Sequence, residues 1–206
     1  MAGELDSDKL LKLGEVINRG LGQSGAVISE MTGLAMEIKA PRIEMIPLKE
    51  IAVIAGGPAS VGVGLYQGIT GDVDGHLLLF FSEQNAYSLV DLLLELPEGF
   101  TAGRGELGPM EYSALSELSN VTGSFFMNSL ADLTGLEIIP STPAVVLDML
   151  GSILDNILAE LSSKGDQALV AEAEFEGMSK GIRGCFLLLP TPEALEIILD
   201  RLGQGL

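Results

Sequence analysis

Two pairs of polar residues with identical spacing are the main candidates for chemistry in this sequence. Glu15 precedes Asn18 by three positions, and Glu117 precedes Asn120 by the same interval. Residues three apart share one face of an α-helix, so each pair would set a carboxylate beside a carboxamide. A carboxylate attracts cations, and a carboxamide both donates and accepts hydrogen bonds. The ordinary alternative is a solvated helix surface, and one pair alone would not separate the two interpretations.

The two pairs belong to segments that repeat. Shifted by 102 positions, residues 15–18 (EVIN) fall on 117–120 (ELSN), and each asparagine stands 23 positions before a proline. Self-similarity of this kind indicates a duplicated unit, which we divide into halves at 6–96 and 110–206. The stretch between them, 97–109, is rich in proline and glycine and is predicted to be a linker within a single domain of residues 1–206.

Each half is expected to open with a long helix that positions its Glu/Asn pair. The first runs from the capping residues around Ser7 to Gly33, and the second runs from Pro109 to Gly135. Apolar residues recur at helical spacing on the face opposite the pairs: Leu10, Leu13, Ile17, Leu21, Ile28 and Met31 in the first half, and Leu115, Leu118, Phe126, Leu130 and Leu133 in the second. Both pairs are therefore predicted to point outward.

The remaining segments alternate between strands and helices. Short runs rich in Val, Ile and Leu predict strands at 61–66, 76–81, 169–175 and 184–189, and helices are expected at 85–96, 145–161 and 193–202. The predicted fold is α/β with a pseudo-two-fold internal repeat. Each half would contribute a long exposed helix, strands and further helices to one shared, mainly antiparallel sheet.

Composition excludes several classes of protein. The 206 residues have a net charge of −18, which repels a phosphate backbone, so we expect no nucleic-acid partner. No apolar run approaches the roughly 20 residues that a membrane-spanning helix needs, so we expect no membrane insertion. A single cysteine, Cys185, cannot form an internal disulfide. The expected location is the cytoplasm.

The repeated pattern Asp/Ser-x3-Glu-x2-Asn-x22-Pro resembles the signature of the CheC/CheX/FliY family of chemotaxis phosphatases. The second copy matches it at every position, with Ser113, Glu117, Asn120 and Pro143. The first copy matches with Glu15, Asn18 and Pro41, but Leu11 stands where the family has Asp or Ser. We therefore expect the second copy to be the stronger site.

The resemblance implies hydrolysis of the aspartyl phosphate on a CheY-type response regulator. By the same resemblance, Asn120 and Asn18 would orient the attacking water, and Glu117 and Glu15 would dock the regulator through a lysine. The phosphorylated partner would hold the Mg²⁺ ion, so no metal site and no cofactor are expected in this chain.

Two other functions stay open at this point. The family resemblance also allows an adaptor that binds and inhibits the receptor deamidase CheD, for which helix 145–161 is the expected contact. That segment has more apolar residues than one buried helix face needs, although deep burial would also explain them. The third possibility is an acidic structural protein with degenerate motifs. The Glu/Asn pair favours the enzyme, because an adaptor does not need it.

Overall fold

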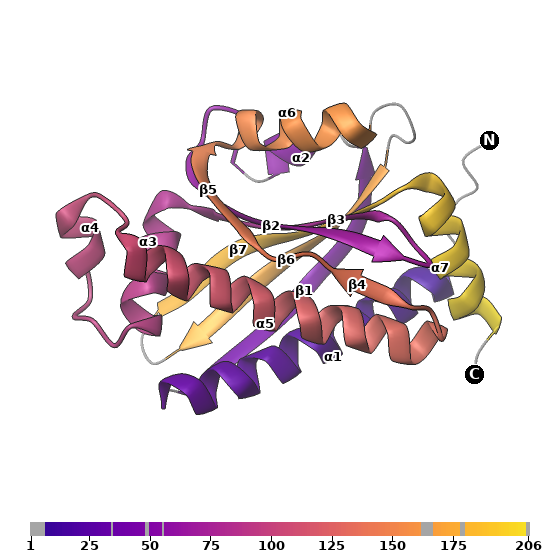
Figure 1. Cartoon of the computed structure of the whole chain (residues 1–206), viewed down its shortest axis with the longest axis horizontal. Coiled ribbons are helices and arrows are strands. Elements are labelled where there is room, and N and C mark those ends of the chain that lie inside the picture. The colour runs from indigo at the N-terminus through magenta and orange to yellow at the C-terminus, as the bar shows by residue number, and fades with distance from the viewer. Residues whose placement is uncertain are drawn as a thin grey trace.

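One antiparallel sheet with helices on both faces forms the framework of the chain (Figure 1). The computed structural model describes residues 7–33, 35–47, 50–54, 56–161, 167–177 and 180–204. Its helices are α1 (Ser7–Thr32), α2 (Ile51–Ile54), α3 (Glu83–Leu93), α4 (Phe100–Arg104), α5 (Pro109–Thr134), α6 (Leu150–Leu161) and α7 (Pro192–Gln204). Its strands are β1 (Met36–Pro47), β2 (Val61–Gly71), β3 (Gly75–Ser82), β4 (Ile138–Pro140), β5 (Ala144–Met149), β6 (Gln167–Gly177) and β7 (Lys180–Pro190).

The sheet confirms the predicted α/β fold with a shared, mainly antiparallel sheet. The strands follow the order β1-β6-β7-β3-β2-β4, and β5 also pairs with β2 beyond the end of β4. Every strand pairing is antiparallel. The strands of residues 110–206 are interleaved with those of residues 6–96, since β6 and β7 lie between β1 and β3.

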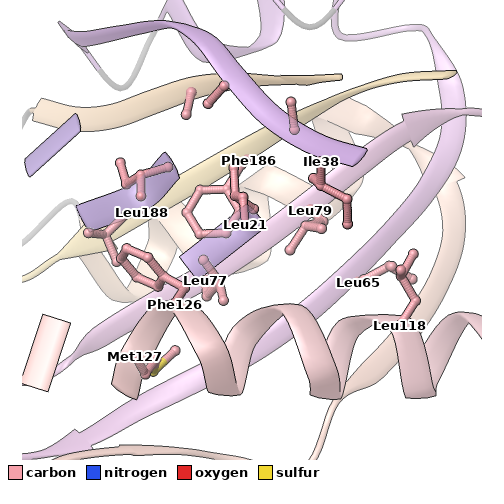
Figure 2. Packing of buried hydrophobic residues seen from close by; sticks show 14 of the residues in the cluster. Leu21, Ile38, Leu65, Leu77, Leu79, Leu118, Phe126, Met127, Phe186 and Leu188 are labelled. Atoms are coloured by element: carbon pink, nitrogen blue, oxygen red, sulfur yellow. The ribbon is translucent and has the colours of Figure 1, made fainter. Parts of the chain in front are cut away.

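Both faces of the sheet bury apolar side chains. Along β3, Leu77 and Leu79 belong to the larger core beneath α1 and α5, whereas Leu78 and Phe80 belong to a smaller core beneath α6 and α2. Figure 2 shows part of the larger core, where α5 contributes Phe126. A strand covered on both faces needs no polar alternation, which explains the continuous apolar run of β3.

The long helices α1 and α5 pack against each other on one face of the sheet (Figure 1). A Cβ atom at Gly20 of α1 would lie 2.6 Å from the Cα of Phe126 in α5, so the two backbones approach closely at this crossing. Phe126 in turn makes an edge-to-face contact with Phe186 of β7, with ring centroids 5.0 Å apart. Within the described residues, no helix is long and apolar enough to cross a membrane.

The two long helices match their predicted bounds closely. Each has 26 residues, and each is followed by a glycine in the left-handed region, Gly33 with φ 68° and Gly135 with φ 67°. The predicted core face of the first helix is wrong at one position. Met31 lies in the last turn, immediately before the chain reverses, and its side chain is 57% exposed.

The prediction of one helix over 145–161 is wrong for its first five residues. Residues 144–149 form β5, with Val145 opposite Leu65 and Val146 opposite Gly64 of β2, and the helix begins only at Leu150. The β-branched valines suit a strand, and the open edge of β2 supplies backbone partners that a helical pattern in the sequence does not reveal.

The segment predicted as a linker contains helix α4. The buried carboxylate of Asp91 at the end of α3 accepts hydrogen bonds from the backbone N–H groups of Gly99 and Thr101, at 2.8 and 2.9 Å. It also accepts the Thr101 hydroxyl at 2.6 Å. These bonds order the chain between α3 and α5.

Candidate functional site

The pair on α5 lies on the outer surface of the molecule. Ser113, Glu117 and Asn120 are all exposed, whereas Leu115 and Leu118 on the opposite face are buried in the larger core. The apolar stripe thus fixes the rotation of the helix and turns the polar residues outward, as the sequence predicted. With the described part of the chain, the Asn120 carboxamide makes no hydrogen bond.

The start of α5 is held by charged and backbone contacts. Pro109 occupies the first turn, and the buried carboxylate of Glu111 accepts a hydrogen bond from the Gly108 N–H at 3.0 Å. Arg104 donates to the same carboxylate at 2.6 Å. The backbone N–H of Glu111 itself and the nearby Arg104 guanidinium lower the pKa of this carboxyl, although burial opposes them. The helix that presents Glu117 and Asn120 therefore begins at a defined position.

Next to Asn120, a buried polar side chain joins α5 to the sheet. Ser119 donates to Oε1 of Gln67 on β2 at 3.4 Å, and Nε2 of Gln67 donates to the Ser141 carbonyl at 3.0 Å. Ser141 lies in the short break between β4 and β5, and half-buried Pro143 lies in the same break. The motif proline is thus part of the sheet irregularity beneath the site, rather than of the exposed surface.

The pair on α1 is also exposed, but its asparagine is engaged. Oδ1 of Asn18 accepts the Ala40 N–H of β1 at 2.8 Å, and Nδ2 donates to the carbonyls of Ala40 and Gly14, both at 3.1 Å. Glu15 is exposed, and Leu11, one turn earlier, is 65% exposed. Pro41 lies in β1, and its side chain is outside the described residues.

The exposed pairs limit the chemistry that the chain can perform. Among the described residues, no group of three His, Cys, Asp or Glu side chains could hold a metal ion. The grooves beside Asn85 and Arg183 have no residue in common with either pair. A carboxylate and a neutral amide on an exposed helix face can bind a partner's cation and orient a small polar molecule at that partner's surface.

Comparisons with known proteins find similar sequences that include α5. The sequence pattern of the CheC-like family matches residues 110–147, which span Ser113, Glu117, Asn120 and Pro143. A relative from Bacillus subtilis, named CheY-P phosphatase CheC, is 28% identical over 196 residues, covering 94% of this chain and 93% of its own. Residues 110–147 are therefore similar to the CheC-like family, and a relative named for that family aligns with nearly the whole chain. A second CheC-like relative, from Halobacterium salinarum, is named putative CheY-P phosphatase CheC1 and is 21% identical, covering 97% and 99% of the two chains.

A solved structure has a similar fold over its whole length. FliY from Thermotoga maritima superposes with a TM-score of 0.78 at 17% identity and covers 99% of both chains. At that identity the likeness concerns the fold alone.

Two contacts at this site were not predicted from the sequence. The bonds of Asn18 to Ala40 and of Gln67 to Ser141 join residues that lie far apart in the chain. A local sequence pattern cannot predict these hydrogen bonds, because each depends on how the chain packs on the sheet.

Proposed function

We propose that this CheC-like chain is a phosphatase that hydrolyses the aspartyl phosphate of a CheY-type response regulator. The observation that supports this most directly is the placement of Glu117 and Asn120, exposed one turn apart on a helix whose start and rotation are fixed. The relatives that cover nearly the whole chain have names that specify a CheY-P phosphatase.

In the proposed reaction, the oxygen of a water molecule bonds to phosphorus while the bond from phosphorus to the aspartyl oxygen breaks. The products are inorganic phosphate and the free carboxylate of the regulator. Acyl phosphates are already reactive, so catalysis consists mainly of positioning the water. The carbonyl oxygen of Asn120 would accept a hydrogen bond from that water. The Glu117 carboxylate would pair with a lysine of the regulator. This ion pair would fix how closely α5 approaches the phosphorylated aspartate of the regulator.

The metal in this proposal belongs to the substrate. The phosphorylated regulator would hold Mg²⁺ beside its own phosphate, and the ion would offset the negative charge there. This chain would add only the amide and the docking carboxylate of α5, so no cofactor of its own is required. Whether α1 adds a second site depends on the bonds of Asn18.

The test is release of inorganic phosphate from a phosphorylated CheY-type regulator. Asn120→Ala should lower the rate more than tenfold, equivalent to about 1.4 kcal/mol of transition-state stabilisation. Asn128→Ala is the matched control, because Asn128 is also an exposed asparagine on α5. Equal rates for wild type and Asn120→Ala would refute the assignment, and a wild-type protein without activity would refute the proposed function.

A second candidate function is binding of the deamidase CheD, and the exposed apolar residues of β5 favour it. Val146, Leu147 and Met149 are 42%, 39% and 46% exposed, whereas Leu150 and Leu154 of α6 are buried. We propose β5, rather than the helix, as the contact. Leu147→Asp should abolish binding to a purified CheD-type deamidase and leave phosphate release unchanged. Ile197→Asp on α7 is the control, because Ile197 is also 39% exposed. Undiminished binding by Leu147→Asp would contradict this contact.

A further inference from the structure

The outer edge of β1 is bonded to side chains of α1. β1 is the terminal strand of the sheet and pairs with β6 on its inner side. On the outer side, Ser29 accepts the Met36 N–H at 2.8 Å and donates to the carbonyls of Gly25 and Met36, at 2.7 and 3.1 Å. Four residues along the strand, Asn18 bonds to Ala40. An edge strand presents a row of backbone groups that need partners, and side chains of α1 supply them at two positions four residues apart.

Between these two contacts, α1 lies directly against the strand. A Cβ atom at Gly25 would lie 3.0 Å from the Ile38 nitrogen and 3.1 Å from the Met36 carbonyl oxygen. The close approach brings the Ser29 and Asn18 side chains within hydrogen-bond distance of the strand backbone. Asn18 acts there in the manner of a neighbouring strand, since its amide pairs with both the N–H and the C=O of one residue.

The carboxamide of Asn18 therefore has little hydrogen-bonding capacity left. Nδ2 donates to two carbonyls and Oδ1 accepts one N–H. To orient a water molecule inside another protein, this side chain would have to leave Ala40. Both backbone groups of Ala40 would then lose their partner in a part-buried place, which is unfavourable.

The same arrangement is not repeated on α5. Ala131 stands where α1 has Ser29, and Thr142, the counterpart of Ala40, lies in the break between β4 and β5. Among the described residues, Asn120 has no such backbone partner. Two residues of matching position in the repeat thus have different surroundings, one bonded to the sheet and one available.

We propose that Asn18 is a structural clamp that closes the outer edge of β1, and that α5 alone provides the water-orienting amide. The second half of this proposal rests on the proposed phosphatase function. The clamp itself is independent of that function, because it concerns only bonds within the chain. Leu11, an apolar residue on the exposed face of α1 beside Glu15, agrees with a surface that has no catalytic role.

The test compares Asn18→Ala with Asn120→Ala, with Asn128→Ala as control. Hydrogen exchange of the Ala40 amide should accelerate at least tenfold in Asn18→Ala and stay unchanged in the other two variants. Phosphate release by the folded fraction should stay within twofold of wild type in Asn18→Ala and fall more than tenfold in Asn120→Ala. If Asn18→Ala does not fold, Asn18→Asp keeps an oxygen for the Ala40 N–H but lacks the amide donors, and its phosphate release should also stay within twofold.

Three results would overturn the proposal. They are unchanged exchange at Ala40 in Asn18→Ala, a loss of phosphate release of more than twofold in folded Asn18→Ala, and the same loss in Asn18→Asp. Failure of the phosphatase proposal would be distinguishable, because wild type would then release no phosphate while the exchange measurement still decides whether Asn18 is a clamp.

Discussion

The crossing of α1 and α5 at Gly20 allows a quantitative prediction. A Cβ at Gly20 would lie 2.6 Å from the Phe126 Cα, 3.0 Å from the Phe126 nitrogen and 3.1 Å from the Phe125 carbonyl oxygen. All three are backbone atoms, so no side-chain rotation can relieve the contact. Gly20→Ala must therefore move the helices apart, and overpacking of this kind costs about 1–3 kcal/mol.

Gly22→Ala on the same helix is the matched control. Its Cβ would meet nothing within 4 Å, so the substitution should stabilise α1 by about 0.5–1 kcal/mol through helix propensity alone. The same propensity gain applies at Gly20, so it cancels when the two variants are compared. The cost of the clash is the difference that remains.

Thermal unfolding followed by circular dichroism would measure that difference. For a chain of this size, 1 kcal/mol shifts Tm by about 2–4 °C, so Gly20→Ala should unfold about 2–12 °C below Gly22→Ala. Equal Tm values for the two variants would refute the inference that the helices meet backbone to backbone at this residue.

Three further outcomes are expected. Phosphate release should fall as salt rises from about 50 to 500 mM, because salt would screen the proposed docking of Glu117 on a cation, and a flat profile would contradict that role. Burial, and to a lesser extent the neighbouring Glu172 carboxylate, raises the pKa of the Cys185 thiol to about 11. Alkylation of Cys185 by iodoacetamide at pH 7.5 should therefore be much slower than alkylation of free cysteine. Equal alkylation rates would contradict the burial of the thiol. Because the pKa of Glu111 is lowered on folding, its ionised form stabilises the fold above pH 4.5. The Tm deficit of Glu111→Gln at pH 7 should shrink as pH falls through the lowered pKa, and a deficit constant down to pH 3 would contradict the lowered pKa of Glu111.

The sequence predicted the parts of the fold that depend on local pattern. Apolar residues at helical spacing and terminal glycines defined α1 and α5, and the outward direction of Asn120 followed from the buried position of Leu118. The order of strands in the sheet could not be predicted, because it depends on pairings between distant segments. For the same reason, residues 145–149 were assigned to a helix although they pair with β2 as part of strand β5.

The two candidate sites differ in how far the sequence could describe them. The exposure of both Glu/Asn pairs was predicted correctly. The difference between Asn18 and Asn120 could be anticipated only from Leu11, which is a neighbour of the pair and not a cause of the difference. The cause is a bond from Asn18 to Ala40, 22 residues away, and it requires α1 to lie along β1.

The interleaved sheet has a consequence for how the chain acquires its structure. β1 has no strand partner until β6 is synthesised, since Ile38 pairs with Phe175. β3 can pair with β2 at once, but its other edge pairs with β7. As the polypeptide leaves the ribosome, neither the first hundred residues nor the second can form a continuous sheet alone. Assembly is therefore governed by contacts between distant segments and should be slow for a chain of this length. Until β6 and β7 are synthesised, the unpaired strand β1 would be exposed to aggregation.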